Sequence, residues 1–186
     1  MATTGWSRHR APSRLQQWRK AFHLDEVDSA PGKLAGWARA LPAAALGSTS
    51  QAQVQDLVTG LQALSDRLKM LMQAREAHQS DAIVRELQED VHGWRVGVQA
   101  IFAGLASEPE SAEFADYRSR LDAKLERLEA RVAEVLDRTD DRSLSTEEGE
   151  NMYRLLGAHR GLSEAVVGLA KQTAAIDWPR LREARF

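Results

Sequence analysis

Apolar residues recur every three and four positions in four successive stretches of this chain. Such an alternation keeps one stripe of a helix facing a partner helix. The pattern therefore predicts an all-α protein, an up-down bundle of four long helices with two short N-terminal helices. The four tracks run from Val54 to Leu71, from Val84 to Leu105, from Phe114 to Val135 and from Met152 to Ile176.

Start and stop signals divide the four tracks into helices. Ser50 with Gln53, and Ser145 with Glu148, have the spacing of capping boxes, in which two side chains satisfy free backbone groups at a helix start. The stretch 77–80 contains neither glycine nor proline, so a single bent helix over 51–105 is an alternative to a turn. That helix would be about 80 Å long at ~1.5 Å per residue, which favours the turn. Short loops between helices of similar length favour antiparallel neighbours.

The chain divides into a basic N-terminal segment, 1–48, and the bundle domain, 49–186. We expect two short helices in the first segment, over about 13–22 and 33–41, because Ala30-Pro31-Gly32 is a chain-breaking sequence. The last long helix is expected to end near Ile176, since Pro179 follows shortly after.

Composition limits the classes of function that the chain can have. It contains no cysteine, which excludes disulfides and thiolate metal sites. No stretch of ~18 apolar residues is present, so we expect no membrane span. Over 107–150 there are fourteen acidic residues against seven basic ones, and this acidic region argues against a nucleic-acid partner.

Candidate catalytic and metal-binding residues are few. Glu89 and His92 form a Glu-x-x-His pair, but a di-iron bundle needs a second such pair, and Leu156 occupies that position before His159. We therefore expect Glu89 and His92 to lie on the solvated surface. With no nucleophile motif, phosphate loop or zinc-ligand spacing, the sequence predicts no enzymatic activity, no cofactor and no metal.

Five residues remain as candidates for an interface or a ligand contact. His159 is the ionisable residue of the fourth track and could contact a ligand or sense protons; the alternative is a core-edge histidine bonded to a neighbouring helix. Gly157 and Gly161 allow close approach, either within the bundle or to another chain. Trp94 is expected in the core, where it could line a pocket with His159. Trp178 either covers the end of the bundle or lies at an interface.

Two C-terminal stretches carry a family resemblance. Residues 152–167 read MYRLLGAHRGLSEAVV, and residues 176–186 read IDWPRLREARF. They resemble the soluble helical segments of the fusaric-acid-resistance, or aromatic-acid-exporter, family of bacterial inner-membrane proteins. The matching residues are Tyr153, Arg154, Leu156, Gly157, Arg160, Gly161, Leu162, Ser163, Glu164, Asp177, Trp178, Arg185 and Phe186.

The resemblance implies a non-catalytic cytoplasmic domain of an exporter-type transporter, located at the inner-membrane face and used for assembly or regulation. Its partners would be other subunits or the membrane portion of the transporter. A stand-alone scaffold that binds a protein partner, and a bundle that binds a small molecule near His159 and Trp94, are the alternatives. A homo-oligomer is also compatible, because such tracks stabilise intramolecular and intermolecular bundles equally well.

Overall fold

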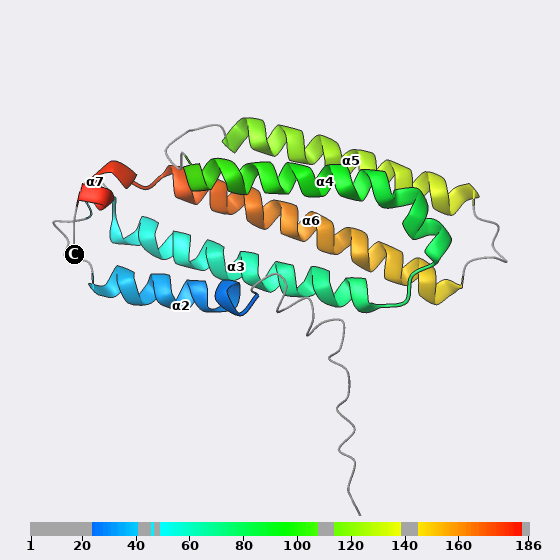
Figure 1. Cartoon of the computed structure of the whole chain (residues 1–186), viewed down its shortest axis with the longest axis horizontal. Coiled ribbons are helices and arrows are strands. Elements are labelled where there is room, and N and C mark those ends of the chain that lie inside the picture. The colour runs from blue at the N-terminus through cyan, green and yellow to red at the C-terminus, as the bar shows by residue number, and fades with distance from the viewer. Residues whose placement is uncertain (1–23, 41–45, 47–48, 108–113, 139–144, 184–186) are drawn as a thin grey trace, which may run out of the picture.

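The computed structural model describes residues 24–40, 46, 49–107, 114–138 and 145–183. Within these ranges the chain forms six α-helices and no strand, which confirms the predicted all-α class (Figure 1). The helices are α2 (Leu24–Ala40), α3 (Gln51–Glu76), α4 (Asp81–Ser107), α5 (Phe114–Arg138), α6 (Thr146–Ala174) and α7 (Trp178–Glu183).

The predicted helix starts are confirmed at both capping boxes. The Ser50 hydroxyl accepts from the Gln53 backbone N–H at 3.1 Å, and the Gln53 side chain accepts from the Ser50 backbone N–H. Ser145 and Glu148 make the same reciprocal pair at the start of α6. The turn between α3 and α4 is confirmed as well, because no helix covers residues 77–80.

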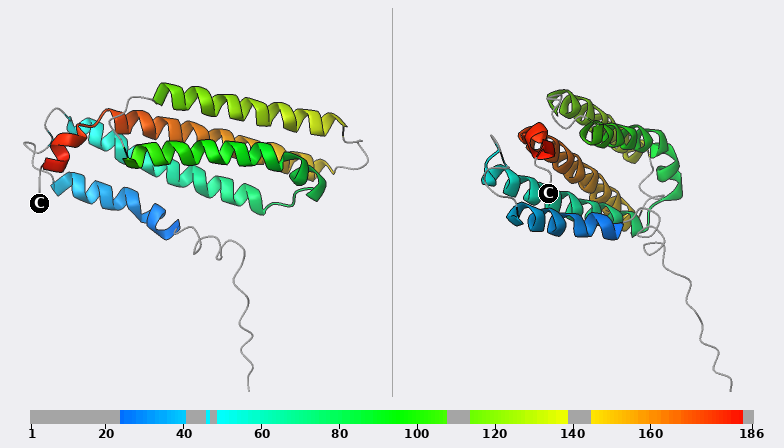
Figure 2. Two further views of the ribbon diagram at one scale, coloured as in Figure 1. Left: turned by 45° about the horizontal axis from the view of Figure 1, so that its top comes forward. Right: turned by 60° about the vertical axis from the view of Figure 1, so that its left-hand side comes forward.

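Helix α6 lies in the middle of the molecule. It packs against α3 on one flank and against α4 and α5 on the other, while α2 covers α3 (Figures 1 and 2). Contacts at the two ends show that α3 and α6 run in opposite directions. The Gln53 amide donates to the Ala175 carbonyl at 3.0 Å at one end, and the Asn151 amide donates to the His78 carbonyl at 3.0 Å at the other.

Helices α4 and α5 form a closely packed pair. A Cβ atom added at Gly97 would lie 2.9 Å from Cδ of Lys124, and one at Gly104 would collide with the Tyr117 hydroxyl. These two glycines therefore allow the helices to approach. An ion pair between Arg127 and Asp90, at 2.8 Å, links the same two helices.

The apolar interior has two parts. The larger cluster joins α3, α4 and α6 and extends to Leu34 and Trp37 of α2 and to Leu181 of α7. The smaller cluster joins α4, α5 and the start of α6, and its buried members are Ile83, Leu87, Leu128, Val132, Val135 and Met152.

The prediction that Val84 belongs to the core is wrong. Val84 is 46% exposed, whereas its neighbour Ile83 is 3% exposed and packs in the smaller cluster. Successive residues of a helix point about 100° apart, so the buried face of α4 begins at Ile83 and continues through Leu87 and Trp94.

The predicted break at Ala30-Pro31-Gly32 is also wrong. Helix α2 continues through Pro31, which is buried. Proline in a helix interior costs about 3 kcal/mol. Contacts with α3 offset this cost: Trp37 packs on the larger cluster, and Asp28 accepts from Ser65 at 2.9 Å and pairs with Lys69 at 3.0 Å.

Two further expectations concern the ends of the chain. The short helix predicted over 13–22 lies outside the described residues. Pro179 was expected to follow the last helix, but it is the second residue of α7, where a missing backbone N–H costs nothing because that group has no intrahelical acceptor. Helix α6 itself ends at Ala174, two residues before the predicted end.

Adjacent substitutions in α4 test which face of this helix is buried. We expect Ile83→Ala to lower the free energy of unfolding by about 2–4 kcal/mol, because it leaves a cavity in the core. Val84→Ala is the matched control and should change it by less than about 0.5 kcal/mol. Urea unfolding followed by circular dichroism measures both. Equal effects of the two substitutions would contradict the described face.

Candidate functional site

Trp94, His159 and Ser163 form a buried polar cluster between α4 and α6. The Trp94 indole N–H donates to the Ser163 hydroxyl oxygen at 2.9 Å. The Trp94 and His159 rings meet edge to face, with centroids 4.5 Å apart and an interplanar angle of 77°. All three side chains are nearly inaccessible to solvent. The structure thus brings together two of the five candidate residues, with Ser163 as an unforeseen third member.

The His159 ring is held within its own helix. Its Nδ1 lies 2.8 Å from the Leu155 carbonyl oxygen, and since a carbonyl only accepts, Nδ1 carries the proton of this bond. Of the two interpretations of His159, the one that places it at the core with a bond to a neighbouring helix is wrong about the bond, because the ring bonds to Leu155 within α6. Burial lowers the pKa of His159, and the positive charge of Arg75 lowers it further, against an opposing effect of the bond to Leu155.

The cluster has the residue types of a catalytic site but not the connections. A serine nucleophile needs its hydroxyl proton directed at a base. Here the Ser163 hydroxyl donates to the backbone carbonyl of His159 at 2.9 Å, not to the imidazole. In this arrangement the cluster acts as a polar link between α4 and α6.

The other three candidates lie apart from this cluster. Gly157 is exposed, and a Cβ atom there would meet nothing within 4 Å. Gly161 is buried, and a Cβ atom there would lie 3.3 Å from Cδ of Arg67 in α3. Trp178 packs on the larger cluster at the end of the molecule and donates to the Thr173 carbonyl at 2.8 Å. Of the two glycines, only Gly161 lies at an internal helix contact.

The expected surface position of Glu89 and His92 is confirmed, because both are exposed. Among the described residues, no group of three or more histidine, aspartate or glutamate side chains is arranged to hold a metal ion.

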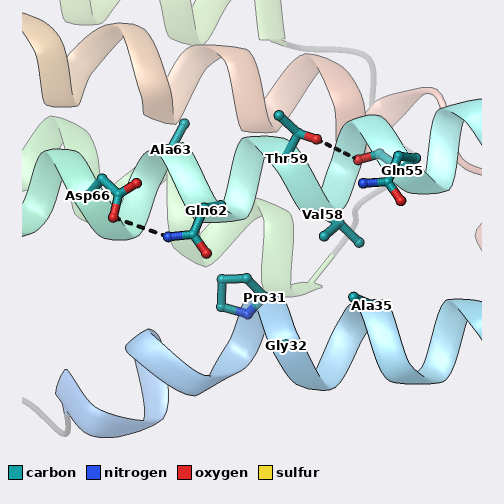
Figure 3. A pocket seen from close by; sticks show the side chains of 9 residues that line it. All are labelled: Pro31, Gly32, Ala35, Gln55, Val58, Thr59, Gln62, Ala63 and Asp66. Atoms are coloured by element: carbon teal, nitrogen blue, oxygen red, sulfur yellow. Dashed lines mark hydrogen bonds between the residues drawn. The ribbon is translucent and has the colours of Figure 1, made fainter.

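Two shallow hollows on the described part of the surface were compared with this cluster, and neither is lined by Trp94 or His159. The larger, of about 530 Å³, is an open groove between α2 and α3 (Figure 3). Pro31, Gly32 and Ala35 of α2 form one side. On the α3 side, Gln62 donates to Asp66 at 3.1 Å, and the Thr59 hydroxyl donates to the Gln55 backbone carbonyl at 3.0 Å.

Sequence reasoning missed an exposed apolar surface on α4. We define the α4 outer face by six exposed residues of its C-terminal half: Val96, Gln99, Ala100, Phe102, Ala103 and Ala106. Val96 is 45% exposed and Phe102 is 37% exposed. A detectable signal was present, because no charged residue occurs between Arg95 and Glu108. The N-terminal half of the same helix instead exposes charged and polar side chains such as Arg85, Glu89 and His92.

Comparison with protein-family models, curated proteins and solved structures finds no match to this chain. Of the helices in the described ranges, none combines the length and the apolar character that crossing a bilayer requires.

The lowered pKa of His159 predicts a pH dependence of stability. Unfolded His159 takes up a proton near its usual pKa of about 6.5, while the folded form does so only at lower pH. The unfolded state thus binds more protons as pH falls below about 6.5, and the free energy of unfolding decreases. Urea titrations at pH 7.5 and 5.5 should show this loss.

His159→Gln should reduce the pH-dependent loss, whereas the exposed control His92→Gln should retain it. Keeping the pH above 5 limits the contribution of carboxylates, which titrate near pH 4. A His159→Gln variant with the wild-type pH dependence would exclude His159 as its source.

A double-mutant cycle measures the link between Trp94 and Ser163. Ser163→Ala leaves a buried indole N–H without an acceptor, which should cost about 1–3 kcal/mol. In a Trp94→Phe background the same change should cost less, because the donor is gone. Equal costs in both backgrounds, measured by urea unfolding, would show that the hydrogen bond contributes nothing to stability.

Proposed function

We propose that this chain is a non-catalytic helical domain that assembles or regulates a larger membrane protein of the exporter type, at the cytoplasmic face of the inner membrane. The observation that carries the assembly role is the α4 outer face, an apolar helix surface left open on the molecule. Exposed apolar patches of this kind mark interaction sites more often than isolated exposed side chains do.

The exporter context rests on the sequence resemblance in α6 and the segment after it. The residues of that resemblance on α6 include buried ones and exposed ones. Gly161, Leu162 and Ser163 are buried, so packing alone accounts for them. Tyr153 and Gly157 are exposed, Tyr153 at 62%. Because the fold does not require these two surface residues, contact with a partner is the reason we propose for them.

The proposal includes the directions of the four long helices. We propose that they form an up-down-up-down bundle. The end contacts of α3 with α6 support opposite directions for that pair. Arg127 with Asp90 and Arg138 with Glu86 support opposite directions for α4 and α5, because the later residue of α5 pairs with the earlier residue of α4. Such a bundle is a rigid spacer that presents its outer faces at fixed distances.

The small-molecule alternative finds less support. It requires a cavity beside Trp94 and His159, but both side chains are buried in packed contacts, and the two surface hollows lie elsewhere. A partner protein is the better fit to an open helix face.

Cell fractionation tests the proposal. In cells of its own source, the epitope-tagged chain should sediment with inner membranes and, after mild detergent extraction, elute in a complex larger than 20.7 kDa. Val96→Glu, which places a charge on the α4 outer face, should release the chain from this complex. Gln88→Glu adds the same charge to the polar half of α4 and should not.

Recovery of the wild-type chain only in the cytosolic fraction would overturn the membrane-assembly role. A complex that is retained equally by both variants would instead remove α4 from the contact.

A further inference from the structure

The geometry points to a second copy of this chain as the partner of the α4 outer face, with the two α4 helices antiparallel across a two-fold axis. This inference rests on the proposed assembly function and names its first contact. Of the five large hydrophobic side chains that the described part of the chain exposes, three belong to α4: Val84, Val96 and Phe102. Val96 and Phe102 lie on the outer face as defined above.

The side chains of this face suit close packing against another helix. Ala100, Ala103 and Ala106 are exposed and short, so a second helix could approach to the lower end of the usual interaxial range of about 8–10 Å. Val96 and Phe102 are the two larger apolar side chains of the same face. Gln99 is the one polar side chain of the face, and it carries no charge that would have to be desolvated.

The charge at one end of the face favours an antiparallel copy. Arg95, which is exposed and contacts His92 at 2.8 Å, lies at the N-terminal end. A parallel pair places Arg95 beside Arg95, whereas an antiparallel pair separates the two arginines. Because like charges brought together oppose association, the antiparallel pair is favoured.

The distribution of large and small side chains on the face is also compatible with a two-fold axis. An isologous interface needs a patch that is complementary to itself. With the axis near Ile101, Val96 of one copy lies at the level of Ala106 of the other, and Phe102 lies at the level of Ala100. Each of the two large apolar side chains is thus level with a small one along the helix axis.

The size of the face predicts a weak dimer. Stable interfaces bury about 800 Å² on each partner. This area is larger than the area that half of a single helix provides. We therefore expect dissociation on the order of micromolar concentrations. Association of this strength becomes significant when many copies are held together, as subunits of a membrane assembly are.

Sedimentation equilibrium of the full chain between about 1 and 200 µM tests the dimer. A reversible monomer–dimer equilibrium is expected. Val96→Glu should weaken it at least about tenfold, and Gln88→Glu, on the charged half of the same helix, should leave it unchanged. Circular dichroism confirms that each variant is folded. A monomer at all concentrations, or equal dimerisation of both variants, overturns the proposal.

The alternative occupant to be tested is the segment 1–23, whose sequence includes Leu15, Trp18 and Phe22. If the wild-type chain is monomeric and a variant that lacks residues 1–23 dimerises, the face is covered by the chain's own N-terminal segment, and the second copy is excluded. If the chain is monomeric while the membrane complex still depends on Val96, the assembly role stands and its partner is a different protein.

Spin labels determine the direction of the pair. The chain has no native cysteine, so His92→Cys provides a single labelling site. In the antiparallel pair centred near Ile101, the two copies of residue 92 are separated by about 27 Å along the helix axis, at ~1.5 Å per residue. A parallel pair would bring them to roughly the interaxial distance of 10 Å. A short distance at residue 92 therefore overturns the antiparallel arrangement.

Discussion

The burial of α6 between two groups of helices is the constraint on which the rest of the structure depends. Val166, in the C-terminal half of α6, is fully buried, and Leu162 and Leu169 on either side of it belong to the same cluster. Neither flank could shield this helix alone, because α3 covers one side and α4 with α5 covers the other. Loss of either flank would expose a continuous apolar surface, which links the stability of all four long helices.

Apolar burial provides the driving force, but it is non-directional, and a few polar contacts fix the positions of the helices. The bond from Trp94 to Ser163 is the clearest of them, because both atoms are buried. Sliding α4 along α6 by one turn would leave the indole N–H without an acceptor. At both ends of α3, bonds between Gln53 and Ala175 and between Asn151 and His78 set its position along α6 in the same way.

Local sequence signals predicted the helices well, and tertiary contacts account for the failures. Both serine capping boxes were recognisable because they depend only on residues three positions apart. The continuous helix through Pro31 was not, since its cost is offset by contacts of Asp28 and Trp37 with α3, which is distant in sequence. The side chain of Val84 lies outside the core for a related reason: periodicity gives the width of an apolar stripe, but only the neighbouring helices decide which edge of it is covered.

The candidate site shows the same division between local and long-range information. The apolar tracks predicted that Trp94 and His159 would be in the core, yet the partner of each followed from the packing of α4 on α6. The positions of close helix approach, in contrast, could not be predicted from the glycines in the sequence. The sequence suggested glycines in α6 as sites of close approach, but the tightest contacts involve Gly60 of α3, beside Gln172 of α6, and Gly104 of α4, beside Tyr117 of α5. A glycine in a sequence does not indicate which helix will approach it.

The two halves of α4 separate folding from association. Its inner face contributes Trp94, Val98 and Ile101 to the core along the C-terminal half, so the fold already uses that surface fully. The outer face of the same half contributes no residue to the core. Charged residues at these positions would therefore be compatible with the fold. The N-terminal half has such residues. A charge can therefore be placed at Val96 without removing any core contact, and the effect on association can be measured on a folded protein.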